Sequence, residues 1–582
     1  MTLLLLNCKI VIIMNKYKWL VKEPLNQKTQ EQFPEISPVA LQLLVDRGLD
    51  TQEKIDEFLK PDYSQDIHDP YLFSQMETAV NRLYLAKEKK EKIVIYGDYD
   101  ADGVCGSSIL FQAFKKVGLD FETYLPDREK EGYGLNQKVV KDLADQGARL
   151  IVTVDCGISN RAEVELAGAL GLEVIITDHH FVPEQLPKAL AIIHPRLDDS
   201  YPFRDLAGGG VAFKLAQAMV SHPKSGLGKK EREAFEKWLL DLVAISTVAD
   251  MVPLLGENRT LVSHGLIVLA KTKNLGLQKL MEVGGINQDK LDARTIGFQI
   301  APRINAAGRM AHANNAYQLL TTENLEEAIV IASQLNKRNL ERQALTDQLV
   351  SQAKEQLGEV KDNQAVLFAW GEGWNPGVIG LVASKITQEY VRPAIVLSFD
   401  GQGYVGSGRS IKEFDLIKAL DKFSSYFIKF GGHKGAAGFS LTKDKFEDFK
   451  FGFEAYAKQA LKGVELTPSL LIDKTISLAE VDWPLVEILE QFKPYGMGNY
   501  QPRFLIKDLA VEAAETVGAT GNHLRLMVKQ GDLKRKIICF GFGEICEQLK
   551  PGDMIEAVCE VGVNQYNGNK ELQLSLIDLK KK

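Results

Sequence analysis

The first third of the chain contains three short apolar runs, each of which ends on acidic residues or histidines. The runs lie at residues 93–96, 150–154 and 174–177 and are rich in β-branched side chains. Segments with the 3.6-residue period of helices separate them, and this alternation is typical of buried parallel strands joined by helices. The pattern predicts an α/β domain built on a doubly wound parallel sheet.

The pattern changes twice further along the chain. Residues 322–357 keep a helical period without proline or glycine, which is long for a globular helix and indicates a rigid linking helix. Residues 365–370 and 394–398 then predict strands of a second α/β domain. After about residue 466, apolar and polar positions alternate in several short segments, which favours a small C-terminal β-barrel of the OB type.

These changes in pattern predict an α/β protein with several domains. Within the first α/β domain, residues 301–309 contain a proline and a glycine and are predicted to interrupt a series of helices. We expect a helical lead-in over 14–75, the first α/β domain over 76–320, the linking helix over 321–360, the second α/β domain over 361–462 and the barrel over 463–582.

The first 13 residues stand apart from this organisation. They form an apolar run with one lysine, which lacks the basic start of a signal peptide and is shorter than the about 20 residues of a membrane span. Met14 and the residues after it look like a natural beginning. We expect residues 1–13 to be a disordered extension or the product of an upstream start codon.

Composition narrows the class of protein. The 45% hydrophobic and 25% charged residues are ordinary for a globular protein. Six scattered cysteines without a CxxC pair argue against a disulfide framework and a zinc ribbon, and they fit the reducing cytoplasm. A net charge of −7 gives no global attraction to nucleic acid, so polyanion binding would depend on local basic surface and metal ions.

The residues at the ends of the three apolar runs predict a metal site. Asp98, Asp100 and Asp102 follow the first run, Asp155 follows the second, and histidines follow the third. The carboxyl ends of neighbouring parallel strands open onto one crevice, so these groups are expected to meet there. Carboxylate oxygens mixed with imidazole suit Mg²⁺ or Mn²⁺. An Asx turn that caps a helix is the alternative, but one aspartate would suffice for it.

Asp178-His179-His180 adds imidazole to this set. Adjacent side chains at a strand end cannot face the same way, so one histidine can bind metal while the other meets the substrate. Asp250, at the end of an apolar helix, is either a solvated helix end or a further acidic ligand. So many ligands exceed the needs of one Mg²⁺ but suit two ions about 3.5–4 Å apart, which favours phosphoester hydrolysis.

Four short motifs that contain these residues resemble those of the DHH phosphoesterases. The resemblance extends from about Tyr17 to the C-terminus and includes the blocks at 131–134, 305–309, 431–433 and 494–499. The motifs are Asp98-Tyr99-Asp100-Ala101-Asp102-Gly103, Val154-Asp155-Cys156-Gly157, Asp178-His179-His180 and Ala249-Asp250.

The resemblance implies a fold and an activity. It implies a DHH catalytic domain, a DHH-associated domain that clamps DNA, and an OB-fold domain. The activity would be a metal-dependent 5′→3′ exonuclease that releases mononucleotides from single-stranded DNA in repair and recombination. His180 and Asp155 would be catalytic. The ligands of two Mn²⁺ or Mg²⁺ ions would be Asp98, Asp100, Asp102, Asp155, His179 and Asp250.

The resemblance also implies contacts with DNA. The alternative interpretation is an ordinary turn for the glycines and an ordinary surface position for the arginines. Arg128, Ser407 and Arg409 would recognise the 5′ end, and Arg303, Asn305 and Arg309 would line the path of the strand. The remaining DNA-binding candidates are Tyr133, Gly431, Gly432 and His433.

Two other functions stay open. The same site could act on short oligonucleotides or cyclic dinucleotides, although such enzymes need no barrel. The chain could also be a non-catalytic single-strand-binding replication factor, which would not need an intact acidic set. By resemblance, the partners are a single-strand-binding protein and a RecQ-type helicase. We expect the protein to be a monomer in the cytoplasm and not to bind a membrane.

Overall fold

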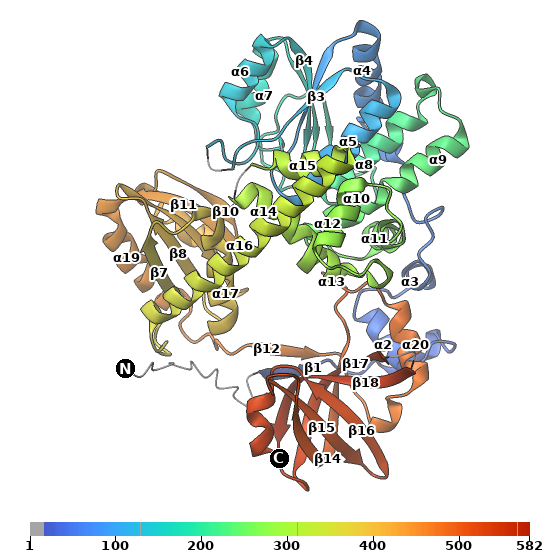
Figure 1. The fold of residues 1–582 in the computed structure, drawn as a ribbon, viewed down its shortest axis with the longest axis vertical. Helices are drawn as coiled ribbons and strands as arrows, with labels where there is room; N and C mark the ends of the chain where they lie inside the picture. Colours follow the sequence, from blue (N-terminus) through green and yellow to red (C-terminus); the bar gives the residue numbers. More distant parts are fainter. Residues whose placement is uncertain (1–16, 129, 311, 567–568) are drawn as a thin grey trace. The chain divides into compact units, whose positions relative to one another are not determined.

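The fold is that of a computed structural model, which describes residues 17–128, 130–310, 312–566 and 569–582. The expectation for residues 1–13 therefore lies outside the described residues. The described chain forms two compact units (Figure 1). Residues 63–466 make one unit, and residues 17–62 pack with 467–582 in the other.

A five-stranded parallel sheet lies at the centre of the first half of the larger unit, as the sequence predicted. The strand order is β3-β2-β4-β5-β6, and every neighbouring pair is parallel. The sequence did not predict the short strand β6 at the end of this order. The strands are β2 (Lys92–Tyr96), β3 (Phe121–Tyr124), β4 (Ala148–Val154), β5 (Glu173–Thr177) and β6 (Ala191–Ile193).

Helices cover both faces of this sheet, because alternate side chains of each strand point to opposite faces. Ile93 and Ile95 pack in the core that contains α4 (Met76–Lys89), α5 (Ala101–Val117) and α8 (Gly208–Ser221). Val94 and Tyr96 pack instead with α6 (Gln137–Asp145) and α7 (Arg161–Ala169) (Figure 1). The predicted doubly wound architecture is confirmed.

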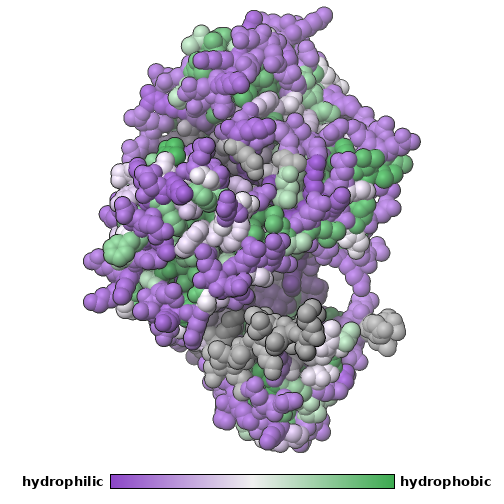
Figure 2. Space-filling model, turned by 60° about the vertical axis from the view of Figure 1, so that its left-hand side comes forward, coloured by the Kyte–Doolittle hydropathy of each residue, from purple (hydrophilic) through white to green (hydrophobic). Residues whose placement is uncertain are grey.

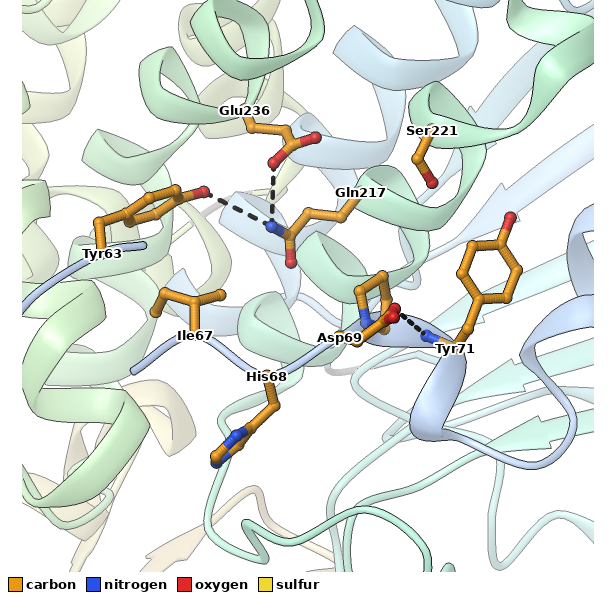
Figure 3. Close-up of a pocket in the computed structure, with 9 residues that line it drawn as sticks. Tyr63, Ile67, His68, Asp69, Tyr71, Gln217, Ser221 and Glu236 are labelled. Carbon is orange, nitrogen blue, oxygen red and sulfur yellow. Dashed lines mark hydrogen bonds between the residues drawn. The ribbon is translucent and has the colours of Figure 1, made fainter. Parts of the chain in front are cut away.

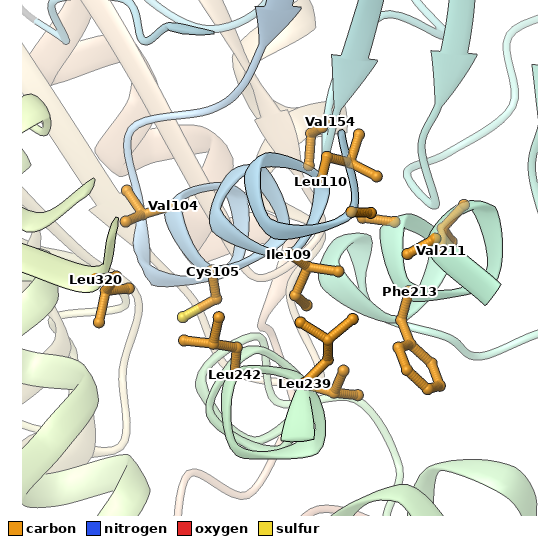
Figure 4. Packing of buried hydrophobic residues seen from close by; sticks show 14 of the residues in the cluster. Val104, Cys105, Ile109, Leu110, Val154, Val211, Phe213, Leu239, Leu242 and Leu320 are labelled. Atoms are coloured by element: carbon orange, nitrogen blue, oxygen red, sulfur yellow. The ribbon is translucent and has the colours of Figure 1, made fainter. Parts of the chain in front are cut away.

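The packing of α5 against α8 and α10 (Leu240–Ala249) positions the functional region. Figure 4 shows Ile109 of α5 in the space between the other two helices, with Val211 and Leu239 in the same cluster. Each buried aliphatic or aromatic side chain stabilises the fold by about 1.5–3 kcal/mol. This core holds the first turns of α5 and α8 in place at the carboxyl edge of the sheet.

The prediction that residues 301–309 interrupt the helices was wrong. The π-helical turn Ile296–Ile300 leads directly into α14 (Ala301–Met310). Pro302 lies just after this π-helical turn, and the irregular hydrogen bonding of such a turn accommodates a residue that has no N–H. The expectation treated proline only as a helix breaker and did not foresee the π-helical turn that accommodates it.

The predicted long helix is present as α16 (Leu325–Leu357), which has 33 residues. The side chain of Asn324 caps its N-terminus, and Gly358 ends it. It packs against α12 (Leu275–Val283), α14 and α17 (Pro376–Tyr390), while α15 (Asn314–Thr321) precedes it. These contacts make α16 a packed link between the two halves of the larger unit.

The second α/β region contains a mixed five-stranded sheet of order β10-β11-β9-β8-β7. Only β7 and β8 are parallel. One face packs on α17, and the other on a phenylalanine-rich core with α19 (Phe446–Ala460). The strands are β7 (Leu367–Glu372), β8 (Ala394–Phe399), β9 (Gly403–Arg409), β10 (Lys429–His433) and β11 (Ala436–Thr442).

The C-terminal strands form the predicted OB-type barrel. The order is β14-β15-β16-β18-β17, and a further pairing of β14 with β17 closes the barrel. The turn expected at Asn567-Gly568 lies outside the described residues, although Tyr566 and Asn569 pair on either side of it. The strands are β14 (Arg503–Val517), β15 (His523–Gln530), β16 (Leu533–Cys539), β17 (Met554–Tyr566) and β18 (Asn569–Lys581).

The first described residues belong to the barrel unit. The strand β1 (Lys18–Val21) pairs in parallel with β12 (Ser469–Ile472), and the Trp19 indole donates to Asp578 at 2.8 Å. The helices α2 (Pro38–Val45), α3 (Gln52–Leu59) and α20 (Trp483–Gln491) complete this unit, in which Phe58 packs on Phe492. The sequence had indicated helices here but not the strand.

On the face drawn in Figure 2, hydrophilic residues predominate and hydrophobic residues occur in small groups. Within the described residues, no helix combines the length and the apolar character needed to cross a membrane.

Candidate metal centre

The candidate site lies at the carboxyl ends of β2, β4 and β5, which are neighbours in the sheet. Asp98 follows β2, Asp155 follows β4, and His179 follows β5. The last residue of α10 is followed by Asp250, which forms the C-cap of that helix. Four separate segments therefore bring carboxylate and imidazole groups to one edge of the sheet.

Backbone amides hold two of the carboxylates. Asp100 is the N-cap of α5 and accepts hydrogen bonds from the amides of Asp102 at 2.8 Å and Gly103 at 3.1 Å. Asp102 accepts from the amides of Gly208 at 2.7 Å and Gly209 at 2.8 Å, and from the Ser246 hydroxyl. The positive ends of α5 and α8 thus stabilise these two anions.

Gly208 gives a way to disturb this arrangement without changing a ligand. A Cβ at position 208 would lie 2.6 Å from the Cβ and Oδ1 of Asp155, so Gly208→Ala must displace that carboxylate. We expect the affinity for Mn²⁺, measured by calorimetry, to fall by about 10–100-fold, as for other residues that orient metal ligands.

The matched control for this prediction is Gly168→Ala in α7. Nothing lies within 4 Å of a Cβ at that position. We expect unchanged Mn²⁺ affinity and a stability gain of up to about 1 kcal/mol from better helix propensity. Equal loss of Mn²⁺ affinity in both variants would show that the position of Asp155 is not the cause.

Asp155 occupies a strained backbone conformation. Its φ is 61°, in the left-handed region that most residues avoid. Its side chain is buried, and its Oδ1 lies 3.1 Å from His179 Nε2 without a hydrogen-bond donor. Strain of this kind is found where the surrounding structure requires a side chain in a particular place.

His179 presents a neutral nitrogen to three carboxylates. Its Nε2 lies 3.1 Å from Asp155, 3.5 Å from Asp250 and 3.7 Å from Asp102. Burial and the neighbouring His180 lower the pKa of His179 to about 3. The ring is therefore neutral at physiological pH and has a lone pair available, which is the form that binds metal.

The buried polar atoms at the centre fit a bound cation. His179 Nε2, Asp155 Oδ1 and Asp98 Oδ1 have no hydrogen-bond partner within the described chain. Such atoms are costly to bury unless an ion or water satisfies them. Three groups bring ligand atoms within 4.8 Å of one another: Asp155-His179-His180, Asp102-His179-Asp250 and Asp98-Asp100-Asp155.

The carboxylates repel one another. Burial together with the charges of Asp102 and Asp100 raises the pKa of Asp250 to about 9. Burial and the charge of Asp100 raise the pKa of Asp102 to about 6. Burial and the other carboxylates also hold the pKa of Asp155 well above its usual value.

These shifts predict how stability depends on pH and metal. In the unfolded chain these carboxyl groups have a pKa of about 4. Without metal, at a pH between that value and the raised pKa values, the folded state binds more protons than the unfolded chain. Its stability therefore falls as the pH rises through this range. Mn²⁺ displaces these protons, and at 100 times its Kd it adds about 2.7 kcal/mol to the free energy of unfolding.

Thermal unfolding at pH 5.5 and pH 8, with and without Mn²⁺, measures this effect. We expect the metal-free protein to be less stable at pH 8, and a given Mn²⁺ concentration to stabilise it more at that pH. Asp250→Asn should lose most of the Mn²⁺ response. Equal Mn²⁺ stabilisation at both pH values would contradict the prediction.

His180 faces a different set of partners. Its Nδ1 lies 2.8 Å from Asp178 Oδ1 and 2.9 Å from the Tyr133 hydroxyl, which donates to the main-chain oxygen of Asp155 at 3.0 Å. Burial disfavours the imidazolium, but the hydrogen bond and charge of Asp178 outweigh it and raise the pKa of His180 to about 9. His180 is thus a half-exposed cation beside neutral His179.

Four arginines gather near this centre. Burial and the repulsion of Arg128, Arg342 and Arg409 lower the pKa of Arg309 to about 10. Burial and Arg128 also lower the pKa of Arg409. Within the described residues, no carboxylate forms an ion pair with Arg309 or Arg409; Arg309 donates to the main-chain oxygen of Gly377 and Arg409 to Ser407 and Gly408. The cluster is therefore rich in unneutralised positive charge.

The other candidate residues are distributed over the larger unit. Asn305 Oδ1 accepts from the Ala101 amide at 2.8 Å and so holds the start of α5. Arg303 donates to Asn336 of α16 at 3.0 Å. Gly431, Gly432 and His433 lie on the exposed edge strand β10, apart from the acidic cluster in sequence and sheet.

Sequence reasoning missed the residues that support the ligands. Asp178 was assigned no role, yet its Oδ1 accepts from the His179 amide at 2.7 Å and orients His180. Gly208 and Gly209 were also missed, although a glycine run at the start of a helix is typical of anion binding. Arg342 and Ser246 left no recognisable signal in the sequence.

Comparison with known families identifies the class of protein. Residues 92–247 match the DHH family, N-terminal domain, residues 363–459 match the DHHA1 domain, and residues 472–578 match the RecJ OB domain. The parallel sheet with acidic residues and histidines at its carboxyl edge is thus that of a DHH protein.

Individual relatives narrow this further. The chain is 36% identical to the single-stranded-DNA-specific exonuclease RecJ of Bacillus subtilis over 97% of this chain and 71% of that one. It is 33% identical to RecJ of Escherichia coli over 94% and 96%. The crystal structure of Thermus thermophilus RecJ in complex with Mn²⁺ matches with a TM-score of 0.83 and 28% identity, over 98% of this chain and 80% of that one. The chain belongs to the RecJ family.

Proposed function

We propose that the protein is a metal-dependent 5′→3′ exonuclease that hydrolyses single-stranded DNA to mononucleotides. The observation that carries the proposal is the cluster of buried ligand atoms at the carboxyl edge of the sheet, close to Arg309 and Arg409. Within the described residues, these ligand atoms have no hydrogen-bond partner and the two arginines form no ion pair. Relatives named as single-stranded-DNA-specific exonucleases support the substrate.

The residues of the centre fit two divalent ions. We assign Asp98, Asp100 and Asp155 to one ion, and Asp102, His179 and Asp250 to the other, with Asp155 close to both because it lies 3.1 Å from His179. RecJ of Thermus thermophilus has been solved with Mn²⁺ and with Mg²⁺, which supports either metal. When bound, such ions lower the pKa of a water molecule and stabilise the charge on phosphate oxygens.

His180 is proposed to contact the scissile phosphate. Asp178 keeps its ring protonated and oriented, and Tyr133 restrains it from the other side. A cationic imidazole can donate a charge-assisted hydrogen bond to a phosphate oxygen and stabilise the negative charge that develops there. Asp178 acts through His180 and is a positioning residue.

The arginine cluster is proposed to bind the 5′-phosphate. Ser407 and Arg409 lie side by side on β9, and a Cβ on Gly380 of α17 would come within 3.0 Å of both. Arg128 rests over the Tyr99 ring at 5.2 Å. A phosphate at the 5′ end carries more negative charge than a phosphate within a continuous strand, which carries one charge. The terminal phosphate would therefore reduce the repulsion among these arginines more.

Further contacts would guide the strand. Arg303, Asn305 and Arg309 all belong to α14, and we propose that this helix lines the path. Gly431, Gly432 and His433 form an exposed edge where backbone and imidazole can approach phosphates; Gly432 cannot carry a Cβ because Ala437 would lie 2.5 Å away. The barrel is proposed to bind bases and phosphates without reading sequence.

The setting of the activity is also a proposal. Resemblance alone supports a single-strand-binding protein and a RecQ-type helicase as partners, and a monomeric state. The described cysteines are free and most are buried, which supports the reducing cytoplasm.

Digestion of 5′-phosphorylated single-stranded DNA and blunt duplex DNA in Mn²⁺ tests the function. We expect mononucleotides from the 5′ end of the single strand and little product from the duplex. Equal hydrolysis of both would contradict the proposal. Activity confined to dinucleotides or cyclic dinucleotides would favour the alternative reading of the same centre.

A further inference from the structure

A cavity lies within the larger unit, away from the metal centre. It has a volume of about 450 Å³, within the range of sites for small molecules. Residues 63–71 form one wall, and the C-terminal half of α8 and the helix α9 (Lys229–Trp238) form the others (Figure 3). Gln217 in this cavity lies nine residues beyond Gly208, which is roughly 13 Å along α8.

Gln217 carries an unsatisfied atom in the cavity. Its side chain is only 7% exposed, and its Nε2 donates to Glu236 Oε2 at 3.0 Å and approaches the Tyr63 hydroxyl at 3.5 Å. A carboxylate can only accept, so the amide nitrogen must face Glu236. The amide oxygen then points the other way, as Figure 3 shows, and no donor in the described part of the chain bonds to it.

The polar groups around this oxygen are mostly acceptors. Glu236 and Asp69 supply carboxylates, and the Tyr71 hydroxyl already donates to the Ala218 carbonyl at 3.0 Å. Burial raises the pKa of Glu236. The nearby Lys214 is fully buried and is already paired with Glu257. Another nearby cation, Arg232, donates to the main-chain oxygen of Ser221 at 2.9 Å. Within the described residues, neither Glu236 nor Asp69 forms an ion pair, so both carboxylates are left for a cationic ligand.

The separation of the acids indicates the shape of the ligand. In Figure 3, Glu236 and Asp69 lie apart, with Gln217 between them. The rings of Tyr63 and Tyr71 line the same cavity and can pack on an alkyl chain, while the Lys237 ammonium already lies over the Tyr63 ring at 5.7 Å from its centre. An ammonium group has three donors and no acceptor, which is the complement of this lining.

We propose that this cavity binds a small aliphatic polyamine. One ammonium group would bind Glu236, and a second would bind the free oxygen of Gln217 and Asp69 toward the more exposed end. The proposal is independent of the nuclease activity, because none of these residues belongs to the metal centre.

Calorimetric titration of the full-length protein with putrescine tests the proposal. The experiment is done in saturating Mn²⁺, which occupies the acidic cluster, and without DNA, whose phosphates bind polyamines. We expect saturable binding of one putrescine per chain. Butylamine, which has a single ammonium group, should bind at least about tenfold more weakly, since it loses a charged hydrogen-bonding group.

Matched variants locate the site. Glu236→Gln should weaken putrescine binding by about tenfold or more. Glu233→Gln removes a charge from the exposed side of the same helix, does not alter the cavity lining, and should bind as the unchanged protein does. Asp69→Asn, at the exposed end, should also weaken binding and gives the same test if Glu236→Gln unfolds.

Three results would overturn the proposal. They are the absence of saturable putrescine binding, equal affinity for butylamine, and equal losses in Glu233→Gln and Glu236→Gln. The last result would show diffuse attraction to an acidic surface. Loss of DNA hydrolysis without change in putrescine binding would bear on the proposed nuclease alone, which keeps the two proposals separable.

Discussion

Asp155→Asn is expected to reduce kcat for single-stranded DNA at least about a thousandfold, because it removes a carboxylate that lies close to both groups of proposed metal ligands. Asparagine is the better replacement, because it tolerates the left-handed backbone at φ 61°. Alanine would combine loss of the ligand with backbone strain, and the two effects could not be separated.

Binding and stability measurements complete the test of Asp155. Calorimetry should show weaker Mn²⁺ binding in Asp155→Asn. The metal-free variant should be at least as stable as the unchanged protein, because one of the repelling carboxylates is gone. Asp120→Asn is the matched control, since Asp120 is an exposed acid before β3 at the opposite edge of the sheet, and its activity should be unchanged. Activity of Asp155→Asn within tenfold of normal would contradict the assigned role.

Arg409→Ala is expected to lower kcat/KM for 5′-phosphorylated single-stranded DNA by about 10–100-fold, the usual effect of losing a charge-assisted hydrogen bond. Substrates with a 5′-hydroxyl should lose much less, because they lack the group that Arg409 is proposed to bind. The ratio of the two rates therefore measures recognition of the 5′ end and is insensitive to a general loss of activity.

The control for Arg409 is Arg149→Ala. Arg149 is exposed at the start of β4, on the edge of the sheet opposite the metal centre. This variant should keep both rates. If Arg409→Ala lowers both rates by the same factor, Arg409 supports the fold or the strand path and does not read the terminal phosphate.

The sequence predicted which acidic residues and histidines meet at one edge of the sheet, because these residues follow a simple rule. Asp98, Asp155 and His179 come just after strands with clear β-branched runs, and parallel strands place their carboxyl ends at one edge. The hydrogen bonds between Asp102 and the amides of Gly208 and Gly209 depend on the packing of α8 against α5, which no local pattern encodes.

Two misjudged segments show the limits of local patterns in the fold. Ala301–Met310 is helical although it contains proline and glycine, because Pro302 follows the π-helical turn Ile296–Ile300 and Gly308 lies close to the main-chain oxygen of Tyr99. The pairing of Lys18–Val21 with Ser469–Ile472 joins the two ends of the chain. The pattern of apolar residues in each short strand does not indicate which distant strand it pairs with.

The uneven support of the carboxylates sets the order in which the centre can assemble. Asp100 and Asp102 are already held by main-chain amides, whereas Asp98, Asp155 and His179 each keep a buried atom without a donor. The first pair can take its final position while the chain folds, before any ion is present. The second set stays exchangeable, so one divalent metal could replace another in the mature protein without unfolding it.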